Sequence, residues 1–281
     1  PAANALGSLR FNIATIAGPT MGGIIITSFG VQYVYLLNLF TYGISVLLLR
    51  KVRKVPITNE GKSPSLSAAK AGFIYAWRRK DLLGTYVVDL LAMALAMPNV
   101  LFPAWAESLH KNWALGFFYS AGTLGALLVS LLSGSMSRFS KHGRGVIIAA
   151  LLWGMSVTLA GIGNNLIWIL FALTLAGGAD MISVYYRSAI WNQSIPDDYR
   201  GRLASIEQLS YSVGPLIGQL RAATMAKWGS LHSSVFFGGI ICMVSILVVA
   251  FFLPKMWSYD VNTDENVKLV KEHRDQHQKS S

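Results

Sequence analysis

Apolar residues along the chain gather into long runs that short polar connections separate. Eight runs stand out, and each is close to the ~20 residues that an α-helix needs to cross a hydrocarbon core about 30 Å thick. They cover residues 8–28, 31–50, 83–105, 113–137, 146–163, 166–194, 206–226 and 235–253. The runs lack the period-2 alternation of barrel strands, and only helices or closed barrels satisfy their backbone groups in lipid. We therefore predict an all-α fold, a polytopic bundle of transmembrane helices in the lipid bilayer.

Composition supports a membrane protein. Of the 281 residues, 53% are hydrophobic and only 13% are charged, about half the charged share that is usual in a soluble domain. The formal net charge of +11 raises the question of nucleic-acid binding. Because the basic residues lie between the apolar runs, as membrane orientation requires, we expect no nucleic-acid partner.

The lysines and arginines also indicate how the chain is oriented. Of the 24 basic residues, 19 follow the second, fourth, sixth and eighth runs, two (Lys111 and Lys227) lie in the other connections, and three lie inside runs. Cytoplasmic connections of membrane proteins are the ones enriched in lysine and arginine. We therefore predict a multi-pass protein of the cell (inner) membrane, with both termini of this chain in the cytoplasm.

Two stretches outside the runs have their own character. Residues 51–82 are strongly basic, with turn residues first and then, over residues 66–77, apolar side chains at helical spacing. This pattern predicts a cytoplasmic linker that ends in an amphipathic helix at the membrane interface. Residues 255–281 are polar and charged, which predicts a disordered cytoplasmic tail.

The first and seventh runs share a short motif. Residues 18–22 read Gly-Pro-Thr-Met-Gly, and the second copy has Gly214, Pro215 and Gly218 at the same spacing. In each copy a proline removes an intrahelical hydrogen bond and kinks the helix, while glycines let a neighbouring helix approach closely. Two runs six helices apart with one signature suggest two parallel halves of six helices each.

The first copy continues as Gly-Pro-x-x-Gly-Gly and resembles the helix-five motif of drug/proton antiporters in the major facilitator superfamily. The positions that carry this resemblance are Gly18, Pro19, Gly22 and Gly23. Ala14 stands where the family has a further glycine. With its linker and charge pattern, the chain resembles the bacterial exporter branch that includes enterobactin exporters and macrolide-efflux proteins.

This resemblance implies a major facilitator fold in which the eight runs are helices 5–12 of twelve, so that the first four helices are lacking. Residues 1–50 would hold the last two helices of the N-terminal half. Residues 51–82 would form the linker, and residues 83–254 the complete C-terminal six-helix half.

The resemblance also implies a degenerate copy of the family's cytoplasmic gate motif after the fourth run. Its positions are Gly134, Gly143 and Arg144, but Arg138 stands where an acid is expected. A plain basic loop that obeys the orientation rule explains these residues equally well.

Four ionisable side chains lie deep inside the runs, where charge is costly and marks a functional site by default. They are Asp89, Asp180, Arg187 and Arg221. Asp180 and Arg187 are roughly 10 Å apart along one helix, so each is expected to find a partner on another helix, with Asp89 and Arg221 as the nearest candidates. Either these charges fix helix packing as neutral pairs, or a carboxylate carries a proton whose affinity an arginine switches.

Candidates for a substrate cavity are Trp191, Tyr211 and Gln208, which lie in the sixth and seventh runs. The chain has none of the phosphate-cradling or catalytic sequence motifs of common enzymes, and we expect neither enzyme activity nor a cofactor. Cys242 is the only cysteine, and we expect a small packed residue there and no metal site.

These features predict a secondary active transporter that exports a small amphipathic molecule of the drug or siderophore class by proton antiport and alternating access. Its partners would be the small-molecule substrate, protons and the bilayer, and no oligomer is required. The alternative is a membrane scaffold or sensor that keeps the fold without transport.

Overall fold

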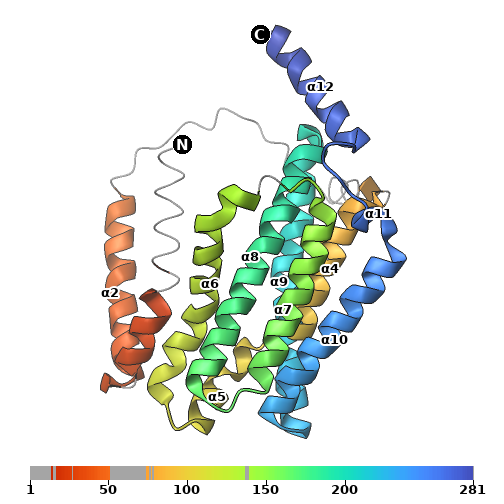
Figure 1. The fold of residues 1–281 in the computed structure, drawn as a ribbon. Coiled ribbons are helices and arrows are strands. Elements are labelled where there is room, and N and C mark those ends of the chain that lie inside the picture. Colours follow the sequence, from red (N-terminus) through yellow and green to blue (C-terminus); the bar gives the residue numbers. More distant parts are fainter. Residues whose placement is uncertain are drawn as a thin grey trace.

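The protein is built from α-helices (Figure 1). Its structure, a computed structural model, describes residue 14 and residues 17–26, 28–50, 74–75, 77, 79–136 and 139–280. Within these residues there is no strand, in agreement with the predicted all-α bundle. The helices are α2 (Val31–Leu49), α4 (Lys80–Ala96), α5 (Phe102–Ser108), α6 (Leu115–Met136), α7 (His142–Gly161), α8 (Leu166–Ser194), α9 (Asp197–Trp228), α10 (Leu231–Phe252), α11 (Pro254–Trp257) and α12 (Glu265–Ser280).

Six helical stretches in the described part are long and apolar enough to cross a membrane. They correspond, within a few residues, to the second, third, fourth, fifth, sixth and eighth predicted runs. Of the first run, a short apolar helix over Ala17–Ile26 is described, and most of the remainder lies outside the described residues. This is the pattern of a multi-pass membrane protein.

The seventh run is helical but more polar than the others. It lies within α9, which carries Glu207, Gln208 and Arg221 and is not among the six apolar stretches. A helix with such side chains enters a membrane only where neighbouring helices cover the charges. α9 therefore depends on neighbouring helices to cover its charged side chains.

A proline breaks the third run. α4 ends at Ala96, and Met97 is extended (φ −79°, ψ 113°), because the ring of the following Pro98 disfavours a helical conformation in the residue before it. The chain continues through a short 3-10 turn, Asn99–Leu101, into α5. A single helix over residues 83–105 was therefore a wrong prediction in this detail.

The long helices of the bundle alternate in direction (Figure 1). α4, α7 and α9 begin at the end that carries α11, and α6, α8 and α10 begin at the end that carries α5. We name these the α11 end and the α5 end. Basic residues of the described connections lie mostly at the α11 end: Arg79, Lys80, Lys141, Arg144 and Lys255 are there, while Lys111 and Lys227 are at the α5 end.

Glycines bring the helices into close contact. A Cβ atom added to Gly177 of α8 would overlap the backbone of Gly122 in α6, and one on Gly125 would overlap the α8 backbone. The crossing of α7 and α10 uses Gly154 and Gly239 in the same way. Membrane helices associate through van der Waals packing rather than through burial from water, so a missing side chain at a crossing increases contact.

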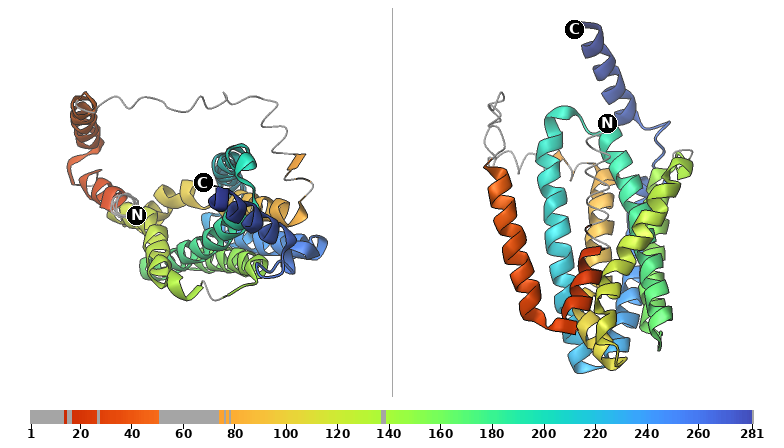
Figure 2. Two further views of the ribbon diagram at one scale, coloured as in Figure 1. Left: turned by 90° about the horizontal axis from the view of Figure 1, so that it is seen from above. Right: turned by 90° about the vertical axis from the view of Figure 1, so that its left-hand side faces the viewer.

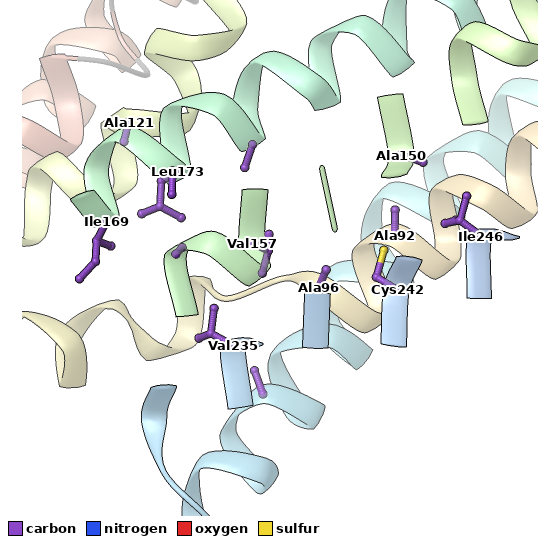
Figure 3. Close-up of a cluster of buried hydrophobic side chains, with 14 of the residues drawn as sticks. Ala92, Ala96, Ala121, Ala150, Val157, Ile169, Leu173, Val235, Cys242 and Ile246 are labelled. Atoms are coloured by element: carbon purple, nitrogen blue, oxygen red, sulfur yellow. The ribbon is translucent and has the colours of Figure 1, made fainter. Parts of the chain in front are cut away.

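The core between these helices is apolar and rich in alanine (Figure 3). Its buried members include Ala92 and Ala96 of α4, Ala150 and Val157 of α7, Ile169 and Leu173 of α8, and Val235, Cys242 and Ile246 of α10. Cys242 is a buried free thiol. This confirms the prediction that the cysteine is a small packed residue.

Helix α2 stands apart from the bundle (Figures 1 and 2). None of its residues is buried, and side chains such as Tyr35 and Leu39 are each 70% exposed. A helix that is apolar all round requires lipid or further protein around it.

The stretch after α10 is helical, whereas a disordered tail was predicted. Met256 of α11 is 1% exposed and presses on Gly84 of α4 and Gly143 of α7, neither of which has a side chain to exclude it. Beyond it, α12 contacts α8. The prediction was wrong because polar composition does not reveal the buried side chains of this segment, which are Met256, Tyr259 and Val270.

A polar contact also ties this segment to the connection between α6 and α7. The backbone N–H of Asn262 and the hydroxyl of Ser140 each donate a hydrogen bond of 3.0 Å to the Asp260 carboxylate. These donors hold the pKa of Asp260 below its usual value, because they stabilise the ionised form.

The predicted amphipathic helix over residues 66–77 lies almost wholly outside the described residues. Its last part is described as helical at Ile74, Tyr75 and Trp77.

We predict that Gly177→Ala destabilises the bundle, because the added methyl group overlaps the Gly122 backbone and over-packing costs about 1–3 kcal/mol. The matched control is Gly122→Ala at the same crossing, where the added Cβ lies 3.9 Å from the Gly177 Cα, an ordinary contact. Thermal unfolding in detergent should show a lower midpoint for Gly177→Ala alone. Equal midpoints would show that the crossing has room for a side chain.

Candidate functional site

A buried ion pair joins α4 to α8. The Nη1 atom of Arg187 lies 2.6 Å from Oδ1 of Asp89, and the two side chains are 2% and 3% exposed. Nε and Nη2 of Arg187 have no hydrogen-bond partner among the described atoms. Either charge alone would be costly in a medium of low dielectric, so each depends on the other. The expected pairing of Arg187 with Asp89 is observed.

Helix α9 supplies a third side to this pair. The Arg187 guanidinium lies over the ring of Tyr211, with Cζ 5.8 Å from the ring centroid, which is a cation–π contact. The Tyr211 hydroxyl donates a 3.1 Å hydrogen bond to Glu207, one turn earlier in α9. Tyr211 is 40% exposed and Glu207 is half-buried. The site is therefore more open toward α9 than at the ion pair itself.

Aromatic side chains cover the ion pair on the side of the α11 end. Tyr86 lies one turn before Asp89, and Trp191 lies one turn after Arg187; their ring centroids are 4.9 Å apart. The Trp191 indole donates a 2.9 Å hydrogen bond to the Thr85 hydroxyl. We call Thr85, Tyr86 and Trp191 the aromatic cap. Its members hold one another in place about one helical turn from the ion pair, toward this end of the bundle.

The other two predicted charges do not join the ion pair. Asp180 is half-buried, and its carboxylate forms no ion pair within the described chain. Arg221 donates through Nη1 to the Ser234 carbonyl of α10 at 3.1 Å and contacts the Met225 sulfur. The expected use of Arg221 as a partner for Asp180 is wrong in this conformation, because Gly238 leaves room for the guanidinium against α10.

The first copy of the Gly-Pro motif packs against the start of α6. Its Thr20 hydroxyl and the Ser120 hydroxyl of α6 share a 2.7 Å hydrogen bond. A Cβ added to Gly116 would overlap the carbonyl oxygen of Pro19, and one on Gly23 would meet the Gly116 backbone amide at 2.7 Å. Close approach of a neighbouring helix is therefore observed at this motif.

Two glycines of the motif do not take part in that contact. A Cβ added to Gly18 or to Gly22 would meet no described atom within 4 Å. Close helix approach was expected at both positions, and within the described part of the chain it is found only at Gly23. The kink expected at Pro19 borders on residues that lie outside the described part.

The second copy brings α9 onto α4. A Cβ on Gly218 would overlap the Met93 carbonyl oxygen, and one on Gly214 would lie 3.1 Å from the Met93 Cβ. Pro215 stands inside α9 without ending it. Close approach of a neighbouring helix is therefore observed at both glycines, and Tyr211, one turn earlier, lies beside Arg187.

The residues predicted as a cytoplasmic gate lie against the segment that follows α10. Gly143 faces the Met256 backbone, and the Arg144 guanidinium lies 5.4 Å from the centroid of the Trp257 ring. Gly134 lies in α6, and its surroundings are outside the described part. The observed contacts explain Gly143 and Arg144 by local packing, and a gate role stays a prediction.

The three candidates for a substrate cavity divide into two groups. Gln208 and Tyr211 are exposed on α9, whereas Trp191 is half-buried in the aromatic cap. Thr85 and Tyr86 were not among the predicted site residues, because a threonine and a tyrosine in an apolar run carry no signal until the fold places them beside Trp191.

Comparison with known sequences assigns this helix bundle to a family. A sequence model of the Major Facilitator Superfamily matches residues 1–185 and, in a second overlapping match, residues 90–275. The chain belongs to the Major Facilitator Superfamily. The resemblance proposed from the Gly-Pro motif is confirmed.

Curated relatives of this superfamily member are exporters by name. The multidrug efflux pump Tap of Mycolicibacterium fortuitum is 27% identical over 266 residues, which cover 92% of this chain and 64% of that protein. The enterobactin exporters EntS of Shigella boydii and Escherichia coli O81 are each 26% identical over 257 residues, which cover 88% of this chain and 60% of theirs. The chain thus spans less than two thirds of the length of these relatives. Comparison with solved structures gave no significant match.

We predict that Asp89→Asn lowers stability by about 3–5 kcal/mol, because it leaves Arg187 buried without a counter-charge. The double variant Asp89→Asn/Arg187→Gln removes both charges and should recover most of this loss. Thermal unfolding of purified protein in detergent measures both effects, with Glu107→Gln, an exposed acid at the α5 end, as the control. A single variant as stable as the unmodified chain would contradict the interdependence of the pair.

Proposed function

We propose that this chain acts in a secondary active transporter that exports a small amphipathic molecule, of the drug or siderophore class, by proton antiport. Membership of the Major Facilitator Superfamily and the names of the relatives, a multidrug efflux pump and enterobactin exporters, support export. The observation that carries the coupling mechanism is the buried Asp89–Arg187 pair. Such a pair gives the protein a group whose protonation changes how two helices hold together.

The chemistry of the pair explains how a proton could drive a conformational change. Ionised Asp89 holds Arg187 and therefore holds α4 to α8. A proton on Asp89 removes its charge, and the guanidinium then has to find another counter-charge or leave the low-dielectric interior. The two arrangements are discrete, which is what a transporter that alternates between two states requires.

Asp180 is the second proton-carrying candidate. It lies about two helical turns from Arg187 on α8, and its carboxylate interacts electrostatically with both Arg187 and Asp89. A proton on Asp180 would change the field around the pair without breaking it directly.

The Gly-Pro motif supplies the proposed pivot. The Thr20–Ser120 hydrogen bond and the glycine contact at Gly116 and Gly23 join the helix over Ala17–Ile26 to α6. In the two-bundle mechanism these helices belong to different halves, so their contact is where one half would rock against the other.

The orientation of the chain is part of the proposal. The α11 end carries most of the basic residues of the described connections, and the positive-inside rule places that end in the cytoplasm. The protein would then lie in the cell (inner) membrane with the C-terminal helix α12 on the cytoplasmic side.

Gradient-driven flux tests this function. We expect the full-length gene product in proteoliposomes to move ethidium, a macrolide or enterobactin when a pH gradient is imposed. The Asp89→Asn/Arg187→Gln variant should lose about tenfold or more of that flux while it still binds the transported probe, because its fold is kept and its titratable carboxyl is gone.

Two outcomes would count against the proposal. An unmodified protein that moves none of the three probes would favour the alternative of a scaffold or sensor. Equal gradient-driven flux in the double variant would remove the ion pair from the coupling mechanism.

A further inference from the structure

The arginine of the ion pair makes one further contact, with a residue outside the aromatic cap. Arg187 is held by Asp89 on one side and lies over the face of Tyr211 on the other. The same tyrosine donates its hydroxyl to Glu207. Tyr211 therefore connects the buried arginine to a carboxylate on a third helix, α9.

The environment of Glu207 differs from that of Asp89. Asp89 is 3% exposed, and the aromatic cap lies about one helical turn from it, toward the α11 end. Glu207 is half-buried and forms no ion pair within the described chain. It interacts electrostatically with both Arg187 and Asp89. Glu207 is thus a charge-bearing acid that lies near the arginine and does not yet hold it.

An arginine that loses a buried partner needs another one. Leaving a buried charge unpaired is strongly unfavourable, and this would oppose protonation of Asp89 if Arg187 had no other partner to reach. Arg187 has a long, flexible side chain, and the aromatic face beneath its guanidinium offers a favourable surface along which the cation can move. The hydroxyl group at the end of this ring is hydrogen-bonded to Glu207, so the ring connects the present position of the guanidinium with that carboxylate.

We propose that Glu207 is the second carboxylate of the coupling switch: Arg187 leaves protonated Asp89 and pairs with Glu207, with Tyr211 as the positioning residue between them. The inference rests on the proposed proton-coupled function. In this structure the arginine is with Asp89, which is the state in which Asp89 is ionised. In the other state the proton is on Asp89, and the new ion pair holds α8 to α9 instead of α4 to α8.

Within the described part of the chain, the titratable groups that contact Arg187 or interact with it electrostatically are Asp89 on α4, Asp180 on α8 itself, and Glu207 and Tyr211 on α9. Tyr86 of α4 interacts electrostatically with Glu207 and Tyr211. Of the two acids not in an ion pair within the described chain, Asp180 lies about two turns along Arg187's own helix and forms no ion pair with the arginine. Among the acids of the described residues that are not in an ion pair, Glu207 is the one linked to Arg187 through a side chain in direct contact, that of Tyr211.

Glu207→Gln tests this assignment, since glutamine still accepts the Tyr211 hydrogen bond but cannot hold a cation. We expect gradient-driven ethidium flux to fall about tenfold or more, while the thermal midpoint in detergent stays unchanged. The residual flux should peak at lower pH than in the unmodified protein, because the state with protonated Asp89 has lost its counter-charge for Arg187. The control Glu107→Gln, at the exposed acid of the α5 end, should leave the pH profile where it was.

A second variant separates the roles of ring and hydroxyl. Tyr211→Phe keeps the aromatic face and removes the bond to Glu207, so we expect a smaller loss than for Glu207→Gln; Tyr211→Ala should lose as much as Glu207→Gln. Flux and pH profile of Glu207→Gln equal to those of the unmodified protein would overturn the assignment. Absence of gradient-driven flux in the unmodified protein would instead reject the proposed function on which it rests.

Discussion

Opposite charges buried in a membrane protein depend on each other more than on anything else around them. The carboxylate of Asp89 and the guanidinium of Arg187, 2.6 Å apart and almost without exposure, can stay ionised only together. That constraint decides how α4 and α8 must face each other. It also explains why α9 can enter the bundle with polar side chains, because its Tyr211 covers the arginine from the remaining side.

Close helix packing is what allows this constraint to be met. Gly214 and Gly218 let α9 approach the backbone of α4, and the ring of Tyr211 reaches Arg187 from that position. Glycines likewise let α6 approach the backbone of α8. Small residues thus have a direct consequence for the site: they set the distance from which a tyrosine and a glutamate face a buried cation.

Much of the fold could be predicted from the sequence, because membrane helices are recognised by their length and apolar composition. The runs that became α2, α6, α7, α8 and α10 were predictable from the thickness of the bilayer alone. The break at Met97 and Pro98 and the helical segment after α10 were missed. The break in the helix depends on a single proline in an otherwise continuous run. The helical segment after α10 depends on buried side chains such as Met256, which packs against two glycines.

The sequence predicted that the site contains buried charged residues, but it identified the residues that meet only in part. Ionisable residues deep in apolar runs identified Asp89 and Arg187, since such residues rarely lack a partner. The sequence could not distinguish Asp180 from Asp89, or Arg221 from Arg187, as members of the pair, because helix rotation and crossing geometry decide which side chains meet. For the same reason the contact of Arg187 with Tyr211 became visible only in three dimensions.

Proton exchange on substrate binding tests most directly whether the Asp89–Arg187 pair is a coupling site. Calorimetry of ethidium binding to the full-length gene product, repeated in buffers with different ionisation enthalpies, gives the number of protons taken up or released. We expect a non-zero number for the unmodified protein and none for Asp89→Asn/Arg187→Gln. The same number of protons in both would contradict a coupling role for the pair.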